Sequence, residues 1–339
     1  MTESSKPDTP APQKTASESA AGKSHPRMGG IALENGLIFV SERYWGAAVR
    51  RADGKIISTS GRKPRLPVGG GGVSTQGGIP LLRGLGRFGE SLLVLAQVKT
   101  KLPEARLPIE GGRVLAALAA ALTASAAVKT AAPRSPLIQE AGGALAAFIP
   151  AVLAVRKGNI SGYHGAEHKV IGGLEATAAA VSAATGGRTV TMIEKGLAET
   201  AKMTAASTTT AGEIVSEAAD LAAREAASMK AATKEHDRCG TNLIGPYLLA
   251  TVATNLLARG RTGEKTPAAS AMAGAASLGI ALEALRWATN HGDTALARLM
   301  LAPGRTVQKR FTTTEPSDEQ LEVGRRALKE LMRLERAGA

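Results

Sequence analysis

The stretch Val114–Val128, VLAALAAALTASAAV, is the first of four alanine-rich apolar runs in this chain. The other three runs are Ala141–Val155, Leu243–Ala258 and Pro267–Ala288. A helix needs about 20 mostly apolar residues to span a bilayer, and alanine favours insertion less than leucine, isoleucine or phenylalanine. Two interpretations therefore follow from these runs: membrane-spanning helices, or the helices of a soluble alanine-rich bundle.

The composition is that of a folded protein. The chain has 339 residues, of which 44% are hydrophobic and 3% aromatic, so it does not belong to the disordered proteins of low hydrophobicity. Its length suggests about two domains, or one domain with tails. Cys239 is the only cysteine, which excludes an intramolecular disulfide.

The chain is strongly basic. Lysine and arginine number 42 against 29 acidic residues, which gives a net charge of +13. Nucleic-acid-binding proteins usually add aromatic residues for stacking or a recognisable motif; because this sequence has neither, we expect no nucleic-acid partner. Residues 27–101 hold twelve basic and four acidic side chains, a surplus typical of the cytoplasmic side of a membrane protein.

The first third of the chain falls into two parts. Residues 1–27 are rich in Ser, Thr, Pro, Lys and Ala, which predicts a disordered tail. Residues 28–110 are expected to form a basic α+β region, with turn signals such as Ala52-Asp53-Gly54 between strands and a helix that begins at Pro80. The expected strands cover residues 31–40, 45–49 and 55–59.

The rest of the chain predicts helices, so the fold class is mainly α: a small N-terminal β-containing region followed by an alanine-rich helical domain. That domain covers residues 111–302 and contains an Ala/Thr-rich insertion at 176–232. Residues 303–339 end in an amphipathic helix, where Ser317 and Gln320 have the spacing of a capping box.

The run Tyr163-His164-Gly165-Ala166-Glu167-His168-Lys169 holds two of the five histidines. On a helix, His164 and His168 project from one face and can bind one metal ion. Glu167 lies near that face, where a carboxylate can act as general base on water. His-x-x-Glu-His is the inverted form of the zincin motif. The alternative is a helix with two surface histidines and an unrelated glutamate.

The candidates for a further metal ligand lie downstream. His236 and Cys239 stand three residues apart, just before an apolar run, and histidine with cysteine suits a borderline metal such as zinc. The alternatives are a loop histidine and a buried cysteine that packs as a small apolar side chain.

Two further acids lie in apolar surroundings. Glu175 follows His168 by seven residues, two helical turns, and could bind metal or support a histidine ligand. Glu283 would be costly in a membrane helix and therefore functional, whereas in a soluble helix it would be an ordinary surface residue. His291 is expected in a loop, and His25 in the tail is expected to have no role.

Five sequence blocks follow one another between residues 28 and 335. They are Gly29–Gly36; Pro80–Gly84 with Glu90–Leu92; Tyr163–Lys169; His236–Thr241; and a C-terminal block with Pro303-Gly304, Gln308, Thr312-Thr313 and Glu315-Pro316. Together they resemble the signature blocks of the YqhQ family, bacterial proteins of unknown function described as predicted metal-dependent enzymes and usually read as multi-spanning membrane proteins. The chain departs from the family at Asp237, where the family usually has proline, and in its longer linker before His236.

The resemblance favours the membrane interpretation, with the N-terminal region in the cytoplasm. It leaves the substrate open, and a soluble cytoplasmic protein is the alternative. From the residues we expect a metal-dependent hydrolase with zinc on His164 and His168 plus His236 or Cys239, and Glu167 as general base. The alternative is a non-catalytic membrane scaffold or sensor whose structural site uses all four ligands. A third, weaker interpretation is a basic adaptor that binds ribosomes or anionic lipid through residues 27–101.

Overall fold

The computed structural model describes residues 28–66, 79–110, 112–132, 134–156, 159–184, 223–259 and 266–338. The predicted tail, with His25, and most of the predicted insertion lie outside the described residues. The chain divides into a large unit, Met28–Gly172 with Ala231–Ala339, and a small unit, Met1–Arg27 with Gly173–Lys230.

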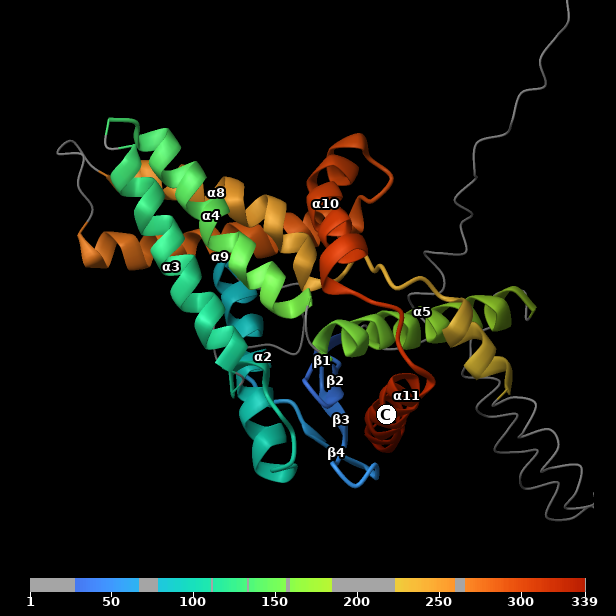
Figure 1. The fold of residues 1–339 in the computed structure, drawn as a ribbon. Helices are drawn as coiled ribbons and strands as arrows, with labels where there is room; N and C mark the ends of the chain where they lie inside the picture. The colour runs from blue at the N-terminus through green and yellow to red at the C-terminus, as the bar shows by residue number, and fades with distance from the viewer. Residues whose placement is uncertain are drawn as a thin grey trace, which may run out of the picture. The chain divides into compact units, whose positions relative to one another are not determined.

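The large unit contains a four-stranded antiparallel sheet whose strands follow the order of the sequence. The strands are β1 (Gly29–Ala32), β2 (Gly36–Val40), β3 (Tyr44–Arg50) and β4 (Ile56–Arg62), drawn in blue in Figure 1. The turn between β3 and β4 falls at the predicted Ala52-Asp53-Gly54, where Gly54 has a φ of 83° that favours glycine.

The expectation of a single strand over residues 31–40 is wrong. The chain turns back between β1 and β2, and the N–H of Leu33 donates to the carbonyl of Gly36 at 2.9 Å. The side chain of Asn35 donates to the carbonyls of Arg50 at 3.1 Å and Glu104 at 2.9 Å. Asn-Gly is a turn signal, so the apolar residues on either side of it belong to two paired strands.

Helix α2 (Leu82–Lys101) covers one face of the sheet. It confirms the helix that was predicted to begin near Pro80. Trp45 is fully buried there in a cluster with Val94 and Val98 of α2. The indole N–H of Trp45 donates to Gln97 Oε1 at 2.7 Å, which satisfies the one polar group of that side chain.

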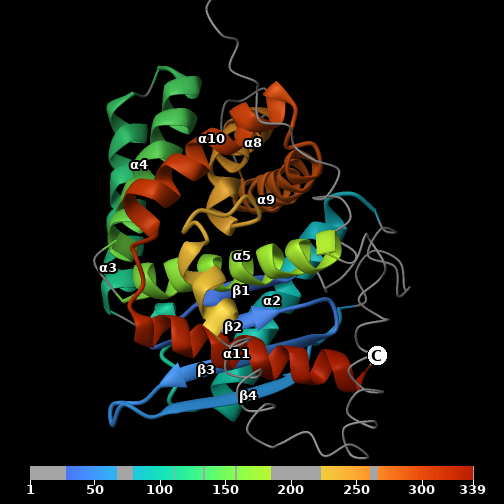
Figure 2. The same ribbon diagram turned by 90° about the vertical axis from the view of Figure 1, so that its right-hand side faces the viewer.

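Helix α11 (Asp318–Ala337) covers the opposite face and runs along the sheet in Figure 2. Gly46 of β3 permits this packing, because a Cβ there would overlap the backbone of Ala327 and Leu331. The predicted capping box is confirmed: the N–H of Gln320 donates to Ser317 Oγ at 3.2 Å, and the N–H of Ser317 donates to Gln320 Oε1 at 3.0 Å. The amphipathic C-terminal helix therefore belongs to the same layered core as the N-terminal sheet.

The remaining elements of the large unit are helical, which confirms the predicted fold class. In chain order they are the short helix η1 (Pro108–Glu110), α3 (Gly112–Ala131), α4 (Pro136–Arg156), the first half of α5 (Ile160–Ala184), η2 (Gly240–Leu243), α8 (Ile244–Leu257), α9 (Pro267–Asn290), α10 (Ala295–Val307) and the short π-helix η3 (Gln308–Thr312). Helices α3 and α4 pack side by side (Figure 1), and α8 packs on α9.

Three described helices, α3, α4 and α9, are long and apolar enough to cross a membrane. The remaining predicted run, Leu243–Ala258, forms α8 (Ile244–Leu257), whose 14 residues are fewer than the roughly 20 that a membrane span needs. Leucines on α3 and α4 point outward: Leu118 is 57% exposed and Leu145 is 53% exposed. A soluble amphipathic helix would turn such side chains inward.

The small unit includes the second half of α5 (Ile160–Ala184) and the helical residues 223–230. Gly173 permits their close approach, because a Cβ on it would stand 2.7 Å from the Cα of Met229. Glu175 lies in this unit.

The contact at Gly46 yields a stability prediction. Gly46→Ala should lower the free energy of unfolding by about 1–3 kcal/mol, because the added methyl group would force α11 off the sheet. Gly29→Ala in β1 is the matched control, since a Cβ there meets no atom within 4 Å. Chemical denaturation of the two purified variants measures the effect, and equal stabilities would contradict the prediction.

Candidate metal centre

The histidine motif lies in the first half of α5, within the large unit. His164 and His168 stand one turn apart, and their ring centroids are 4.5 Å apart. The predicted helix and the shared face of the two histidines are therefore both present.

Each imidazole is oriented by a backbone carbonyl. Nδ1 of His164 lies 2.9 Å from the carbonyl oxygen of Thr312, and Nδ1 of His168 lies 2.5 Å from that of Lys234. A carbonyl can only accept, so in both rings Nδ1 carries the proton and Nε2 presents its lone pair. Nε2 of His168 is buried and has no hydrogen-bond partner among the described residues.

Cys239 completes a group of three potential ligands. The Nε2 and Sγ atoms of His164 and Cys239 are 3.0 Å apart, and the candidate ligand atoms of His164, His168 and Cys239 all lie within 4.8 Å of one another. Because Nε2 of His164 has no proton, the thiol donates to it. The hydroxyl of Thr241 donates to the same sulfur at 3.1 Å.

The environment of this group is dry. Burial lowers the pKa of His168 to about 3 and raises the pKa of the Cys239 thiol to about 12. Burial also lowers the pKa of His236. The His168 ring is therefore neutral at physiological pH, which is the form that binds a metal ion, and the thiol must lose its proton to do so.

Glu167 is buried between α5 and the sheet. A Cβ on Gly30 of β1 would stand 2.5 Å from Cδ of Glu167. Burial raises the pKa of Glu167, whereas the charges of His164 and His236 and a hydrogen bond from the backbone of Gly30 lower it. The glycine block at the start of the sheet thus provides the floor beneath this carboxylate.

His236 lies beside the group without belonging to it. Its ring centroid is 5.8 Å from that of His168, and its Nδ1 accepts from the N–H of Arg238 at 3.2 Å. Of the two predicted downstream ligands, Cys239 has an atom in the group of three and His236 stands next to it.

Two buried amides hold the loop that carries His236 and Cys239. Gln308 accepts from the N–H of His236 at 2.9 Å and donates to its carbonyl at 3.2 Å. It also donates to Asn242 at 3.0 Å, while Asn242 donates to the carbonyls of His236 and Asp237 at 3.1 Å and 2.7 Å. Gly304 of α10 has no room for a Cβ beside Asn242.

The segment from η3 to the start of α11, residues 308–316, crosses α5; we call it the C-terminal strap. The N–H of Thr314 donates to the carbonyl of Ser161 at 3.0 Å. Gly165 leaves no space for a Cβ against the carbonyl of Thr314, and Lys169 forms an ion pair with Glu315 at 2.6 Å. The strap therefore presents the Thr312 carbonyl to His164.

The supporting groups were not identified as such from the sequence. Thr312 and Lys234 act through backbone carbonyls, which carry no sequence signal. Gln308 and the Thr312-Thr313 pair do occur in the C-terminal block that resembles the YqhQ family. This block is the sequence pattern that could have identified them as supporting residues. Asn242 follows directly after the His236–Thr241 block.

The remaining candidates lie elsewhere. Glu283 of α9 forms an ion pair with Arg83 of α2 at 2.5 Å. His291 follows α9 as expected for a loop residue, and its ring stacks on Trp287 with 4.9 Å between centroids. Glu175 belongs to the small unit, and its predicted role stays a prediction.

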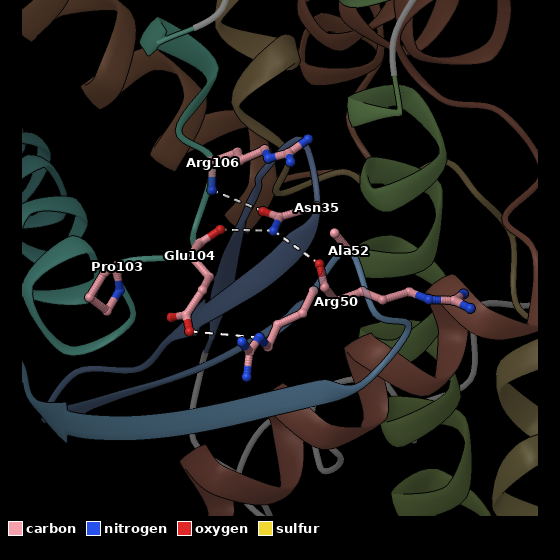
Figure 3. Close-up of a pocket in the computed structure, with 7 residues that line it drawn as sticks. Asn35, Arg50, Ala52, Pro103, Glu104 and Arg106 are labelled. Atoms are coloured by element: carbon pink, nitrogen blue, oxygen red, sulfur yellow. Dashed lines mark hydrogen bonds and ion pairs between the residues drawn. The ribbon is translucent and has the colours of Figure 1, made fainter.

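A separate pocket of about 330 Å³ opens beside the β1–β2 turn, as Figure 3 shows. Its lining residues are Asn35, Arg50, Arg51, Ala52, Pro103, Glu104 and Arg106. Arg51 pairs with Glu104 at 3.8 Å, and Arg50 forms an ion pair with Glu319 of α11. None of these lining residues belongs to the histidine–cysteine group.

The amide network yields a second stability prediction. Gln308→Ala should lower the free energy of unfolding by about 1–3 kcal/mol for each buried group left without a partner. Lys309→Ala is the matched control, because its exposed side chain predicts a change within about 0.5 kcal/mol. Denaturation curves of both variants provide the measurement, and a neutral Gln308→Ala would show that the network does not stabilise the loop.

Comparisons with known proteins bear on the chain's family. Residues 217–334 match the family model "Protein of unknown function (DUF1385)". No curated protein and no solved structure matches the sequence. The matched residues include His236, Cys239 and the C-terminal strap, and the YqhQ family consists of DUF1385 proteins. The match over residues 217–334 is therefore consistent with the resemblance of the sequence blocks to the YqhQ family.

Proposed function

We propose that this chain is a membrane protein with a divalent metal centre, and that the centre catalyses a hydrolysis. One observation carries the proposal: His164, His168 and Cys239 place three ligand atoms within 4.8 Å of one another. Both imidazoles are already held by their Nδ1 atoms.

The residues fit a zinc ion. Two imidazoles and one thiolate suit a borderline metal, and a hydrogen bond from Nδ1 to a carbonyl is the usual support of a histidine ligand. A buried nitrogen without a partner, such as Nε2 of His168, costs about 1–3 kcal/mol, a cost that a bound ion would remove.

Three protein ligands are typical of catalytic zinc sites, whereas structural sites have four. A zinc ion held here would supply Lewis acidity that polarises a carbonyl or phosphoryl oxygen. Glu167 is the group that accepts a proton from water and returns it to the leaving group. Its burial against Gly30 orients the carboxylate and keeps bulk water away from it.

The second candidate function is a non-catalytic scaffold or sensor. The position of His236 supports it, because the ring lies only 5.8 Å from that of His168. With His236 as a fourth ligand the coordination would be complete, which is the pattern of a structural site.

The proposed location is the cytoplasmic membrane. The lengths of α3, α4 and α9 support it, as do the exposed leucines on α3 and α4. The basic surplus over residues 27–101 supports a cytoplasmic position for the sheet and α2.

Metal analysis tests the centre. Purified wild-type protein should carry about one equivalent of divalent metal, and both the His164→Ala/His168→Ala double variant and Cys239→Ala should lose it. His291→Ala, which changes a histidine outside the group, should keep it. A metal-free wild type whose properties the double variant leaves unchanged would contradict the proposal. Retention of metal in His236→Ala favours three ligands, and its loss favours the closed site.

Glu167→Gln distinguishes enzyme from scaffold. The variant should keep its metal and lose turnover by about 10²–10⁴-fold, because the proton acceptor is removed. The measurement is hydrolysis of a panel of model ester, amide and phosphoester substrates, together with complementation of cells that lack the protein. Glu42→Gln, in an exposed turn, is the control. Full complementation by metal-loaded Glu167→Gln would support the scaffold instead.

A further inference from the structure

Helix α2 has a second apolar face that no part of the described chain covers. Its first face holds Val94 and Val98, both fully buried under the sheet. Its second face carries large apolar side chains that are 41% to 51% exposed. They are Leu82, Phe88, Leu92 and Leu93, and we call them the α2 stripe.

The α2 stripe is one continuous surface. At 100° per residue its four members fall within an arc of about 140°, opposite Val94 and Val98. A helix on the surface of a soluble domain normally has charged or polar residues on the side away from the core. An apolar face of this kind marks a site of contact with a partner or a membrane.

The start of α2 is anchored on α9, a helix that is long and apolar enough to span a membrane. Arg83 donates to Glu283 at 2.7 Å and 2.5 Å. Leu81 has a φ of 73°, an unusual conformation for leucine. Its Cα would be 3.4 Å from a Cβ on Gly279, so α9 packs directly against the strained residue.

The position of this anchor along α9 indicates a depth near the bilayer surface. Glu283 lies one turn before Trp287, and tryptophan is enriched at the membrane–water interface. Ile79 and Leu81, which lead into α2, are also exposed. The apolar surface of α9 therefore continues through the start of α2 into the stripe.

Outside the stripe, α2 carries charged side chains. Glu90 pairs with Lys63 at 2.8 Å, Lys99 pairs with Glu110 at 2.9 Å, and Lys101 donates to the carbonyl of Ser60 at 2.9 Å. A helix that combines an apolar side with charged side chains is typical of helices that lie in the plane of the membrane interface.

We propose that the first half of α2 lies flat in the interface of the bilayer, with the α2 stripe against lipid acyl chains beside α9. The inference rests on the proposed membrane location. The second half of α2 then holds the sheet, and with it Gly30 under Glu167, at the membrane surface.

Site-directed fluorescence tests the insertion in the full chain, reconstituted in vesicles of phosphatidylcholine and phosphatidylglycerol. A single cysteine replaces Leu92 and is labelled with an environment-sensitive dye; the native Cys239 is buried, and the unchanged chain gives its background. Thr100→Cys is the matched control, because Thr100 is exposed on the same side of α2 as Leu82 but five turns later. Leu118→Cys on α3 reports membrane insertion itself.

The dye at Leu92 should lose most of its fluorescence to nitroxide-labelled lipids and little to aqueous iodide, while the dye at Thr100 should do the reverse. If the Leu118 dye responds to the lipids and the Leu92 dye responds only to iodide, the proposal for α2 is overturned and the membrane location stands. A Leu92 dye shielded from both quenchers would indicate a protein occupant such as a second copy, and would also overturn it. If no position responds to lipid, the membrane location itself fails.

Discussion

The close contact between α11 and β3 is the constraint on which the rest of the large unit depends. Gly46 lets the helix backbone approach the strand backbone, and no larger residue fits there. Because α11 is held on the sheet, the C-terminal strap that leads into it must cross α5. The carbonyl of Thr312 then reaches Nδ1 of His164, and the lone pair of Nε2 points into the group with Cys239. A backbone contact at one end of the chain thus orients a candidate ligand near its middle.

The candidate centre is assembled from four segments that are distant in sequence. Helix α5 supplies the two histidines and Glu167, and the loop before α8 supplies Cys239. The strap and the end of α10 hold that loop through Gln308, and β1 provides the floor beneath Glu167. Every candidate side chain is therefore oriented by a hydrogen bond or a packing contact from another segment, as preorganised sites require.

Much of the local structure could be predicted because its causes are local. The helical periodicity after Pro80, the capping box at Ser317 and the turn at Gly54 each depend on a few neighbouring residues. The hairpin at Asn35 was missed because its apolar flanks suggest one long strand, although Asn-Gly is itself a turn signal. The apolar run Leu243–Ala258 was predicted by composition and forms α8 with nearly the same bounds, but a helix of 14 residues is too short to span a bilayer.

The sequence by itself determined the histidine pair at helical spacing and the glutamate between them, because a helix places residues four apart on one face whatever surrounds it. Only the tertiary structure decided that Cys239 joins the pair while His236 stands beside it, since two side chains three residues apart in a loop point wherever backbone contacts direct them. It also decided which nitrogen of each ring is available. The carbonyls of Thr312 and Lys234 make that choice, and a backbone carbonyl is common to every residue type, so no sequence pattern can show it.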